Sequence, residues 1–189
     1  YAFNKSHAAA YAVVSYQTAW LKYYFPVEYM AALMTSVIDN PSKVSEYIYA
    51  CRQMNIKILP PDINRGEANF SVDGGDIRYG LAAIKSIGRP VIKAIVEDRE
   101  ELWLFQYLED FITRLSAKNI LNKRTIENLI KAGALDTLGG TRKQFMSIYV
   151  QIVDHVTQEK KNSMVGQMTL FDLVSEDQKE EILLSDLHS

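Results

Sequence analysis

The sequence contains one cysteine among its 189 residues, so no disulfide can form within the chain. A single thiol fits a reducing compartment. No His or Asp lies close to Cys51 in the sequence. We therefore interpret Cys51 as a buried structural residue rather than as a nucleophile.

Long apolar runs are also missing. None approaches the roughly 18 residues that would cross a bilayer, and the opening letters YAFNKSHAAAYA lack the pattern of a secretory signal. We expect a cytoplasmic protein with no membrane contact. The chain has no initiator methionine and opens inside a helix-like pattern, so we expect it to be a piece of a longer protein.

The net charge is small, at −2, but it is unevenly distributed. Residues 77–150 hold 12 Lys/Arg against 8 Asp/Glu, whereas residues 151–189 hold 3 against 8. A mildly basic middle region permits contact with nucleic acid without requiring it.

Glycine and proline are few and mark the boundaries of expected elements. Pro26 and Pro41 are each expected in the first turn of a helix, and Asn40 is expected to cap the second of these helices. The letters IKIL are a short β candidate. The run Asp73-Gly74-Gly75-Asp76 between alternating stretches predicts a β-hairpin, because glycine accepts the positive φ of a tight turn.

Everything after the hairpin is predicted to be helical, with a polar linker beginning at residue 158. The expected fold is mainly α, with a short β-hairpin between two helical parts. The predicted later helices cover residues 81–86, 90–99, 105–115, 123–132 and 142–157.

The stretch LAAIKSIGRPVIKAI predicts two helices that meet at Ile87-Gly88-Arg89. Gly88 has no Cβ and lets a ligand approach the backbone, while Lys85, Arg89 and Lys93 lie within about two helical turns of it. A DNA phosphate would suit that place. The pattern resembles a helix-hairpin-helix motif, which holds the DNA backbone without reading sequence, although Ser86 stands where the motif usually has glycine.

A second copy of the pattern, LIKAGALDTLGG, has Gly133 in its turn with Lys131 beside it. Either copy alone could be an apolar turn packed in a core. Two copies about 45 residues apart favour a nonspecific contact with duplex DNA.

Lys5 and His7 stand at the start of the first predicted helix, where the helix dipole disfavours positive side chains. One interpretation is a contact with an external anion such as a triphosphate. The alternative is a solvated helix end, which composition alone favours.

Seven stretches in order resemble the C-family replicative DNA polymerases of bacteria, the alpha subunits of DNA polymerase III: FNKSHAAAYA, YQTAWLK, PVEYMAALM, ILPPDIN, GLAAIKSIG, LIKAGALD and QMTLF. The resemblance covers nearly the whole chain. It implies that residues 1–58 end a fingers domain and that 59–80 are a β-hairpin connector. It further implies a tandem helix-hairpin-helix module at 81–157, followed by a flexible linker and tail at 158–189.

The resemblance also implies that DNA synthesis is catalysed elsewhere. The paired aspartates that hold two metal ions in the family are absent from this sequence, so we expect no catalytic residue, bound cofactor or metal site in this piece, and magnesium only in the complete polymerase. Lys5 and His7 become candidates for nucleotide or template contact. The complete chain would bring in other replisome subunits.

The letters QMTLF correspond to the family's internal site for the sliding clamp, its beta subunit. Leu170 and Phe171 could enter an apolar groove while the Gln167 amide hydrogen-bonds at its edge. The alternative is that these side chains anchor the tail on the protein's own helices.

The leading hypothesis is therefore a fragment of a template-directed DNA polymerase. A second hypothesis is a noncatalytic DNA-repair or processivity adaptor with helix-hairpin-helix repeats and a clamp peptide. A palm domain with paired aspartates, encoded upstream in the parent gene, would support the polymerase hypothesis, and its absence would reject that hypothesis. A purely structural helical domain is the third.

Overall fold

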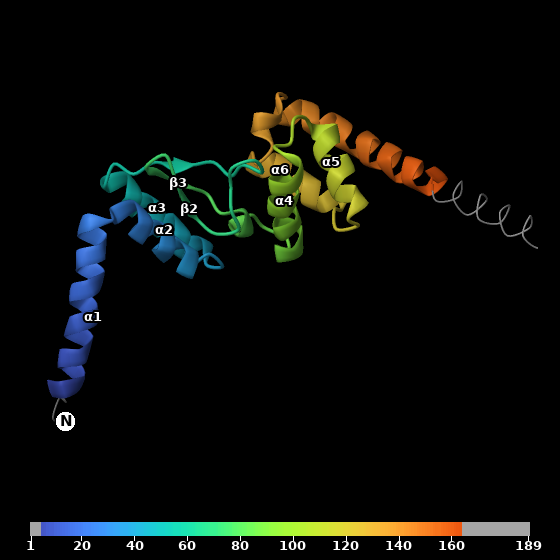
Figure 1. The fold of residues 1–189 in the computed structure, drawn as a ribbon. Helices are drawn as coiled ribbons and strands as arrows, with labels where there is room; N and C mark the ends of the chain where they lie inside the picture. Colours follow the sequence, from blue (N-terminus) through green and yellow to red (C-terminus); the bar gives the residue numbers. More distant parts are fainter. Residues whose placement is uncertain (1–4, 164–189) are drawn as a thin grey trace, which may run out of the picture.

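The computed structural model describes residues 5–163, which are mainly α-helical, as the sequence predicted (Figure 1). Three helices come first, then three short strands, then a second group of helices. The elements are α1 (Lys5–Tyr24), α2 (Pro26–Ser36), α3 (Pro41–Gln53), β1 (Ile58–Leu59), β2 (Ser71–Asp73), β3 (Asp76–Arg78), η1 (Leu81–Ala83), α4 (Arg89–Leu102), α5 (Leu108–Ala117), α6 (Lys123–Ala132) and η2 (Asp136–Leu138). Residues 142–163 form a further helix.

The early helix boundaries follow the predicted signals. Pro26 opens α2, and Pro41 opens α3 at the first position after the cap. The Asn40 side chain accepts a hydrogen bond from the Lys43 amide at 3.2 Å, which satisfies one of the free donors of the helix start. Helix α1 has no buried residue and projects away from the rest of the molecule (Figure 1).

The predicted hairpin is confirmed, and IKIL adds a third strand to it. β2 and β3 pair antiparallel around Gly74 and Gly75, whose φ angles are +63° and +88°. β1 pairs parallel to β3, with Ile58 opposite Ile77. The sequence predicted the strand but not this parallel pairing, because its partner lies about 20 residues away.

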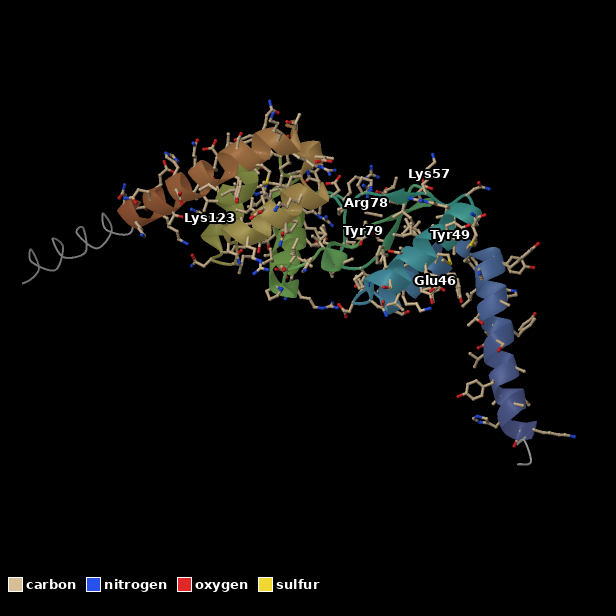
Figure 2. All side chains as sticks on the ribbon, turned by 180° about the vertical axis from the view of Figure 1, so that it is seen from behind. Glu46, Tyr49, Lys57, Arg78, Tyr79 and Lys123 are labelled. Carbon is tan, nitrogen blue, oxygen red and sulfur yellow. The ribbon has the colours of Figure 1, made fainter. Side chains whose placement is uncertain are left out.

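The side chains form two apolar cores. The N-terminal core joins α2, α3 and the sheet, and its members are Met30, Ala31, Met34, Ile38, Val44, Cys51, Ile56, Phe70 and Ile77. Cys51 is fully buried there, and burial raises the pKa of its thiol, which fits the predicted structural role. The C-terminal core joins α4, α5, α6 and the last helix. In Figure 2, Tyr49 and Tyr79 lie in the N-terminal part and Lys123 in the C-terminal part.

Segment 62–67, which we call the anchor segment, ties these later helices together. Ile63 is fully buried in the C-terminal core, and its amide donates to the Ala134 carbonyl at 3.0 Å. Asn64 accepts from the Phe105 amide at 2.8 Å and donates to the Phe105 carbonyl at 2.9 Å. Arg99 donates to the Ile63 carbonyl at 3.0 Å. The predicted connector at 59–80 therefore contains part of the later core.

Four of the predicted helix ranges differ from the structure. The helix predicted at 90–99 runs further, as α4, to Leu102. Helix 81–86 is only the single 3-10 turn η1, because Ile84 is extended, with ψ 125°, and its side chain lies in the core. Helix 105–115 begins later, at Leu108, because Asn64 holds Phe105 in the loop before it.

The last helix is longer than predicted and runs through residues 158–163, which composition had assigned to a linker. Its Lys160 ammonium donates to the Asn119 side chain at 2.5 Å and to the Ser116 carbonyl at 3.3 Å. These contacts with the end of α5 hold the polar turn of helix in place.

Replacing Ile63 by Ala should lower the free energy of unfolding by about 2–5 kcal/mol, the usual cost of truncating a fully buried side chain. Urea unfolding followed by circular dichroism measures the loss. Ile148→Ala is the matched control, because that side chain is 39% exposed and its truncation should cost less than about 1 kcal/mol. Equal losses for the two variants would contradict the anchoring role.

Candidate nucleic-acid interface

The first predicted turn places its apolar side chains inward and its polar groups outward. Ile84 and Ile87 lie in the C-terminal core, each 8% exposed. Lys85, Gly88 and Arg89 are exposed. Ile87 can therefore contact a ligand only through its backbone, while its side chain fixes the turn against the core.

Ser86 resolves the departure from the expected glycine. Its φ is +63°, in the left-handed region that glycine usually occupies. Ser86 thus adopts a backbone conformation that glycine favours even though a side chain is present, and that side chain is exposed.

Gly88 leaves the backbone at the start of α4 open. A Cβ built on Gly88 would meet only the Pro90 ring, at 3.5 Å. The amides of Gly88 and Arg89 have no hydrogen-bond partner among residues 5–163. Two free donors at the positive end of a 14-residue helix form a suitable contact for a phosphate oxygen.

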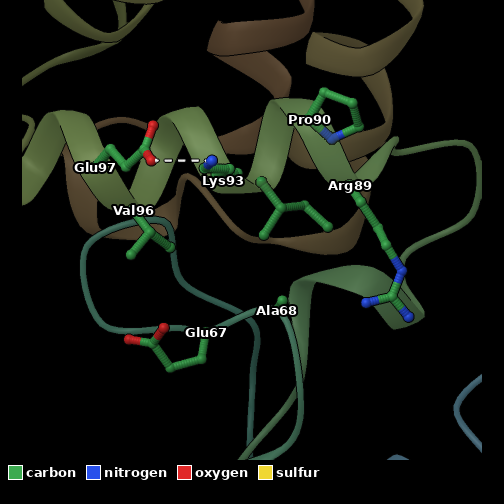
Figure 3. A pocket seen from close by; sticks show the side chains of 8 residues that line it. Glu67, Ala68, Arg89, Pro90, Lys93, Val96 and Glu97 are labelled. Carbon is green, nitrogen blue, oxygen red and sulfur yellow. Dashed lines mark ion pairs between the residues drawn. The ribbon is translucent and has the colours of Figure 1, made fainter.

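The side chains around this turn are mostly basic. Arg89 occupies the first turn of α4, which contains no acidic residue, and it has no ion-pair partner in the described part of the chain. Lys93, one turn further on, faces Glu97 at 3.5 Å on the helix surface (Figure 3). Because both of those groups are well exposed, water screens that pair and Lys93 can exchange its partner at little cost.

A hollow of about 650 Å³ opens next to Arg89, between α4 and the loop that joins β1 to β2 (Figure 3). The sequence did not predict this hollow, because its two walls lie more than twenty residues apart. Its lining is mixed in character and consists of Glu67, Ala68, Arg89, Pro90, Ile92, Lys93, Val96 and Glu97.

The second predicted turn is closed by the protein itself. Gly133 has a φ of +82° and ends α6. A Cβ on Gly133 would overlap the Arg142 guanidinium, which is paired with Asp136 at 2.6 Å. The hydrogen bond to Asp136 raises the pKa of Arg142. Lys131 is paired with Glu127 one turn earlier on α6.

The helix that follows the second predicted turn is the last helix. Its start at residue 142, rather than Gly133, therefore corresponds to the start of α4. There Thr141 and Gln144 form a capping box: the Thr141 amide donates to the Gln144 side chain at 2.9 Å, and the Gln144 amide donates to the Thr141 hydroxyl at 3.2 Å. The cap occupies the Thr141 amide, the counterpart of the free Gly88 amide, whereas the Arg142 amide, like that of Arg89, has no hydrogen-bond partner within residues 5–163. Arg142 was not predicted as a site residue. The Thr-x-x-Gln pattern before an apolar run could have indicated the capped helix start beside it.

Lys5 and His7 lie on α1, far from the first turn (Figure 1). Both are exposed, and the His7 ring packs edge-on against Tyr11 with centroids 4.7 Å apart. Gln167, Leu170 and Phe171 lie outside the described residues.

Within residues 5–163, no three His, Cys, Asp or Glu side chains are grouped in a way that could hold a metal ion. Among the helices of that same part, none combines the length and the apolar character needed to cross a membrane.

A family model described as a helix-hairpin-helix motif matches residues 55–145. The match starts before the anchor segment, which agrees with the place of Ile63 in the C-terminal core.

Several curated proteins named DNA polymerase III subunit alpha are similar over most of the chain. The protein of Vibrio cholerae is 46% identical over 183 residues, which is 96% of this chain. That of Escherichia coli K12 is 45% identical over 178 residues, or 94%, and that of Mycobacterium tuberculosis CDC 1551 is 44% identical over 171 residues, or 90%. The chain is homologous to a segment of the DNA polymerase III alpha subunit.

The homologous segment is a small part of those subunits. This chain spans 16% of the length of the Vibrio protein, 15% of the Escherichia protein and 14% of the Mycobacterium protein.

The two turns should differ in their tolerance of a methyl group. Gly133→Ala should lower the free energy of unfolding by more than about 1 kcal/mol, because φ is positive and the new Cβ would displace Arg142. Gly88→Ala should cost less than about 1 kcal/mol, since φ is −74° and the space is open. Urea unfolding of the two variants measures the difference, and a larger loss for Gly88→Ala would contradict this description of the turns.

Proposed function

We propose that this chain is the duplex-gripping segment of a template-directed DNA polymerase that acts in DNA replication. The observation that carries the proposal is the open turn at Gly88, with two free amides and unpaired Arg89 at one helix start. The helix-hairpin-helix match and the homology to alpha subunits agree with it.

The turn would hold one phosphate group of the DNA backbone. Amides of Gly88 and Arg89 donate to phosphate oxygens, and the Arg89 and Lys85 side chains supply the positive charge. None of these groups reads a base edge, so the contact is independent of sequence. Because Ile84 and Ile87 fix the turn to the core, the donors are held in place before DNA arrives.

The second turn would contribute less, and through side chains. The Thr141 amide is taken by the Gln144 side chain, so contact there falls mainly to the side chains of Arg142 and the neighbouring Lys143. Arg142 would have to share its guanidinium between Asp136 and a phosphate. We therefore propose that the first turn supplies more of the affinity than the second, and that Lys131 and Gly133 contact DNA only at the edge of the interface.

Nucleotide addition belongs to other parts of the complete polymerase, and the magnesium ions belong there too. We propose that this chain alone incorporates no nucleotides, and that Lys5 and His7 contact nucleotide or template only within the complete enzyme. The tail residues Gln167, Leu170 and Phe171 are proposed to bind the sliding clamp. A ring on the same duplex would raise the effective concentration of the polymerase at the primer end.

Reversing charge at the first turn should weaken duplex binding for all DNA sequences. Arg89→Glu with Lys93→Glu should lower affinity at least tenfold, and the slope of log affinity against log salt should fall by about 2, because two positive side chains at and beside the turn no longer neutralise phosphate charge. Fluorescence anisotropy with duplexes of unrelated sequence, at several salt concentrations, measures both quantities.

The matched control is Arg52→Glu with Lys57→Glu, which makes the same change in net charge on the N-terminal part of the molecule. It should keep the salt slope within about half a unit of the original. Equal losses for both double variants would show that net charge rather than the turn decides binding.

Clamp binding should depend on the tail pair. Leu170→Ala with Phe171→Ala should abolish binding to the clamp, because the two side chains supply about 3–6 kcal/mol of apolar burial before ordering costs. Surface plasmon resonance with immobilised clamp measures it. Leu183→Ala with Leu184→Ala removes similar apolar area from the same tail and should leave binding intact; clamp binding retained by the first variant would refute the assignment.

A further inference from the structure

The loop between α4 and α5 presents a group of apolar side chains to solvent. Trp103 is 84% exposed and Tyr107 58%, and Leu102 and Leu104 are 58% and 51% exposed. We call these four side chains the aromatic loop patch. Trp and Tyr are the residues most often found at the energetic centre of protein interfaces.

The backbone at the centre of this patch is strained. Trp103 has a φ of 73° and a ψ of 177°, a combination that is essentially confined to glycine. The indole gains little from the fold in return, because most of it faces water. A residue with a strained backbone and a solvent-exposed side chain is unusual. Such strain is often retained for function.

Several contacts from the core hold the strained loop in one shape. The Arg114 guanidinium donates to the Trp103 carbonyl at 3.0 Å and to the buried Asp98 carboxylate at 2.7 Å. The same guanidinium lies 4.2 Å from the centre of the Phe105 ring. Asn64 of the anchor segment pairs with the Phe105 backbone on both sides. The patch is therefore preorganised, which lowers the entropic cost of binding a partner.

The charges around the patch narrow the choice of partner. Glu100, Glu101 and Glu109 are exposed and carry no ion pair within residues 5–163. Three unpaired carboxylates repel the phosphates of DNA and of lipid surfaces, and they also disfavour the same loop of a second copy. The patch lies at the end of α4 opposite to the DNA-binding turn, about 20 Å away along a 14-residue helix.

We propose that the aromatic loop patch docks into an apolar pocket rimmed by Lys and Arg on another domain of the complete polymerase chain. This inference rests on the proposed function. The alpha subunits that resemble this chain are six to seven times longer, since it spans 14–16% of them. Four side chains make a small contact for a separate protein, but a tethered domain gains from high effective concentration and needs less area.

The test is a photo-crosslink within the complete polymerase chain. p-Benzoylphenylalanine replaces Trp103, and after irradiation the crosslinked peptides are identified by mass spectrometry. We expect a crosslink inside the same polypeptide, to a segment beyond the 189 residues that contains Lys or Arg. The same amino acid at Tyr49, which is 65% exposed on α3, should not label that segment. No crosslink, or one to DNA or to a separate subunit, would overturn the proposal.

Charge reversal tests the basic rim. Glu100→Lys with Glu101→Lys should reduce the crosslink yield from position 103 at least fivefold. An unchanged yield would rule out a basic partner surface.

Trp103→Gly separates docking from stability. In the 189-residue chain it should raise the melting temperature, because glycine adopts the observed backbone angles without strain. In the complete chain it should reduce crosslinking from p-benzoylphenylalanine at Tyr107 at least fivefold. A higher melting temperature with undiminished crosslinking would show that the indole does not dock, and would overturn the proposal.

Primer extension by the same preparation of the complete chain reports on the proposed function independently. Extension without the crosslink would reject the docking proposal alone. The crosslink without extension would reject the polymerase function while the interdomain contact stands.

Discussion

The architecture of the helix-hairpin-helix part depends on the anchor segment, which enters the core from outside the helices that it organises. Ile63 fills the centre, and its two backbone groups bond to Ala134 and Arg99. Asn64 holds the loop before α5. One short stretch thus fixes the turn after α6, the end of α4 and the aromatic loop patch relative to one another. Helices of 10 to 14 residues are marginally stable alone, so they depend on their shared core, which includes Ile63, to keep one arrangement.

The anchor segment thereby fixes two different surfaces, one at each end of α4. At its start, free amides and Arg89 form a positive surface that suits phosphate. At its end, carboxylates surround exposed Trp103 and form a surface that suits a basic protein partner. The formal charge of the whole chain, −2, hides this separation, because opposite charges on opposite ends of one helix cancel in the sum.

The two turns also differ in what they leave available. Gly88 is open and its amide is free, whereas the corresponding amide of Thr141 donates to the Gln144 side chain. The sequence repeats therefore do not translate into two equal sites. The similar letters LAAIKSIG and LIKAGALD each form a turn whose apolar side chains pack on the core. Capping residues a few positions later decide which backbone amides remain free to bind a ligand.

The sequence by itself determined the mainly α fold, the helix starts at Pro26 and Pro41, the hairpin at Gly74-Gly75 and the exposed turn at Gly88, because each depends on neighbours within a few residues. The resemblance to alpha subunits also followed from local motifs. Tertiary structure alone decided the parallel pairing of β1, the shortened helix after Leu81 and the helix through Lys160. It alone decided the closure of Gly133 by Arg142 and the strained exposure of Trp103, since both depend on contacts that bring separate segments together and no local pattern encodes them.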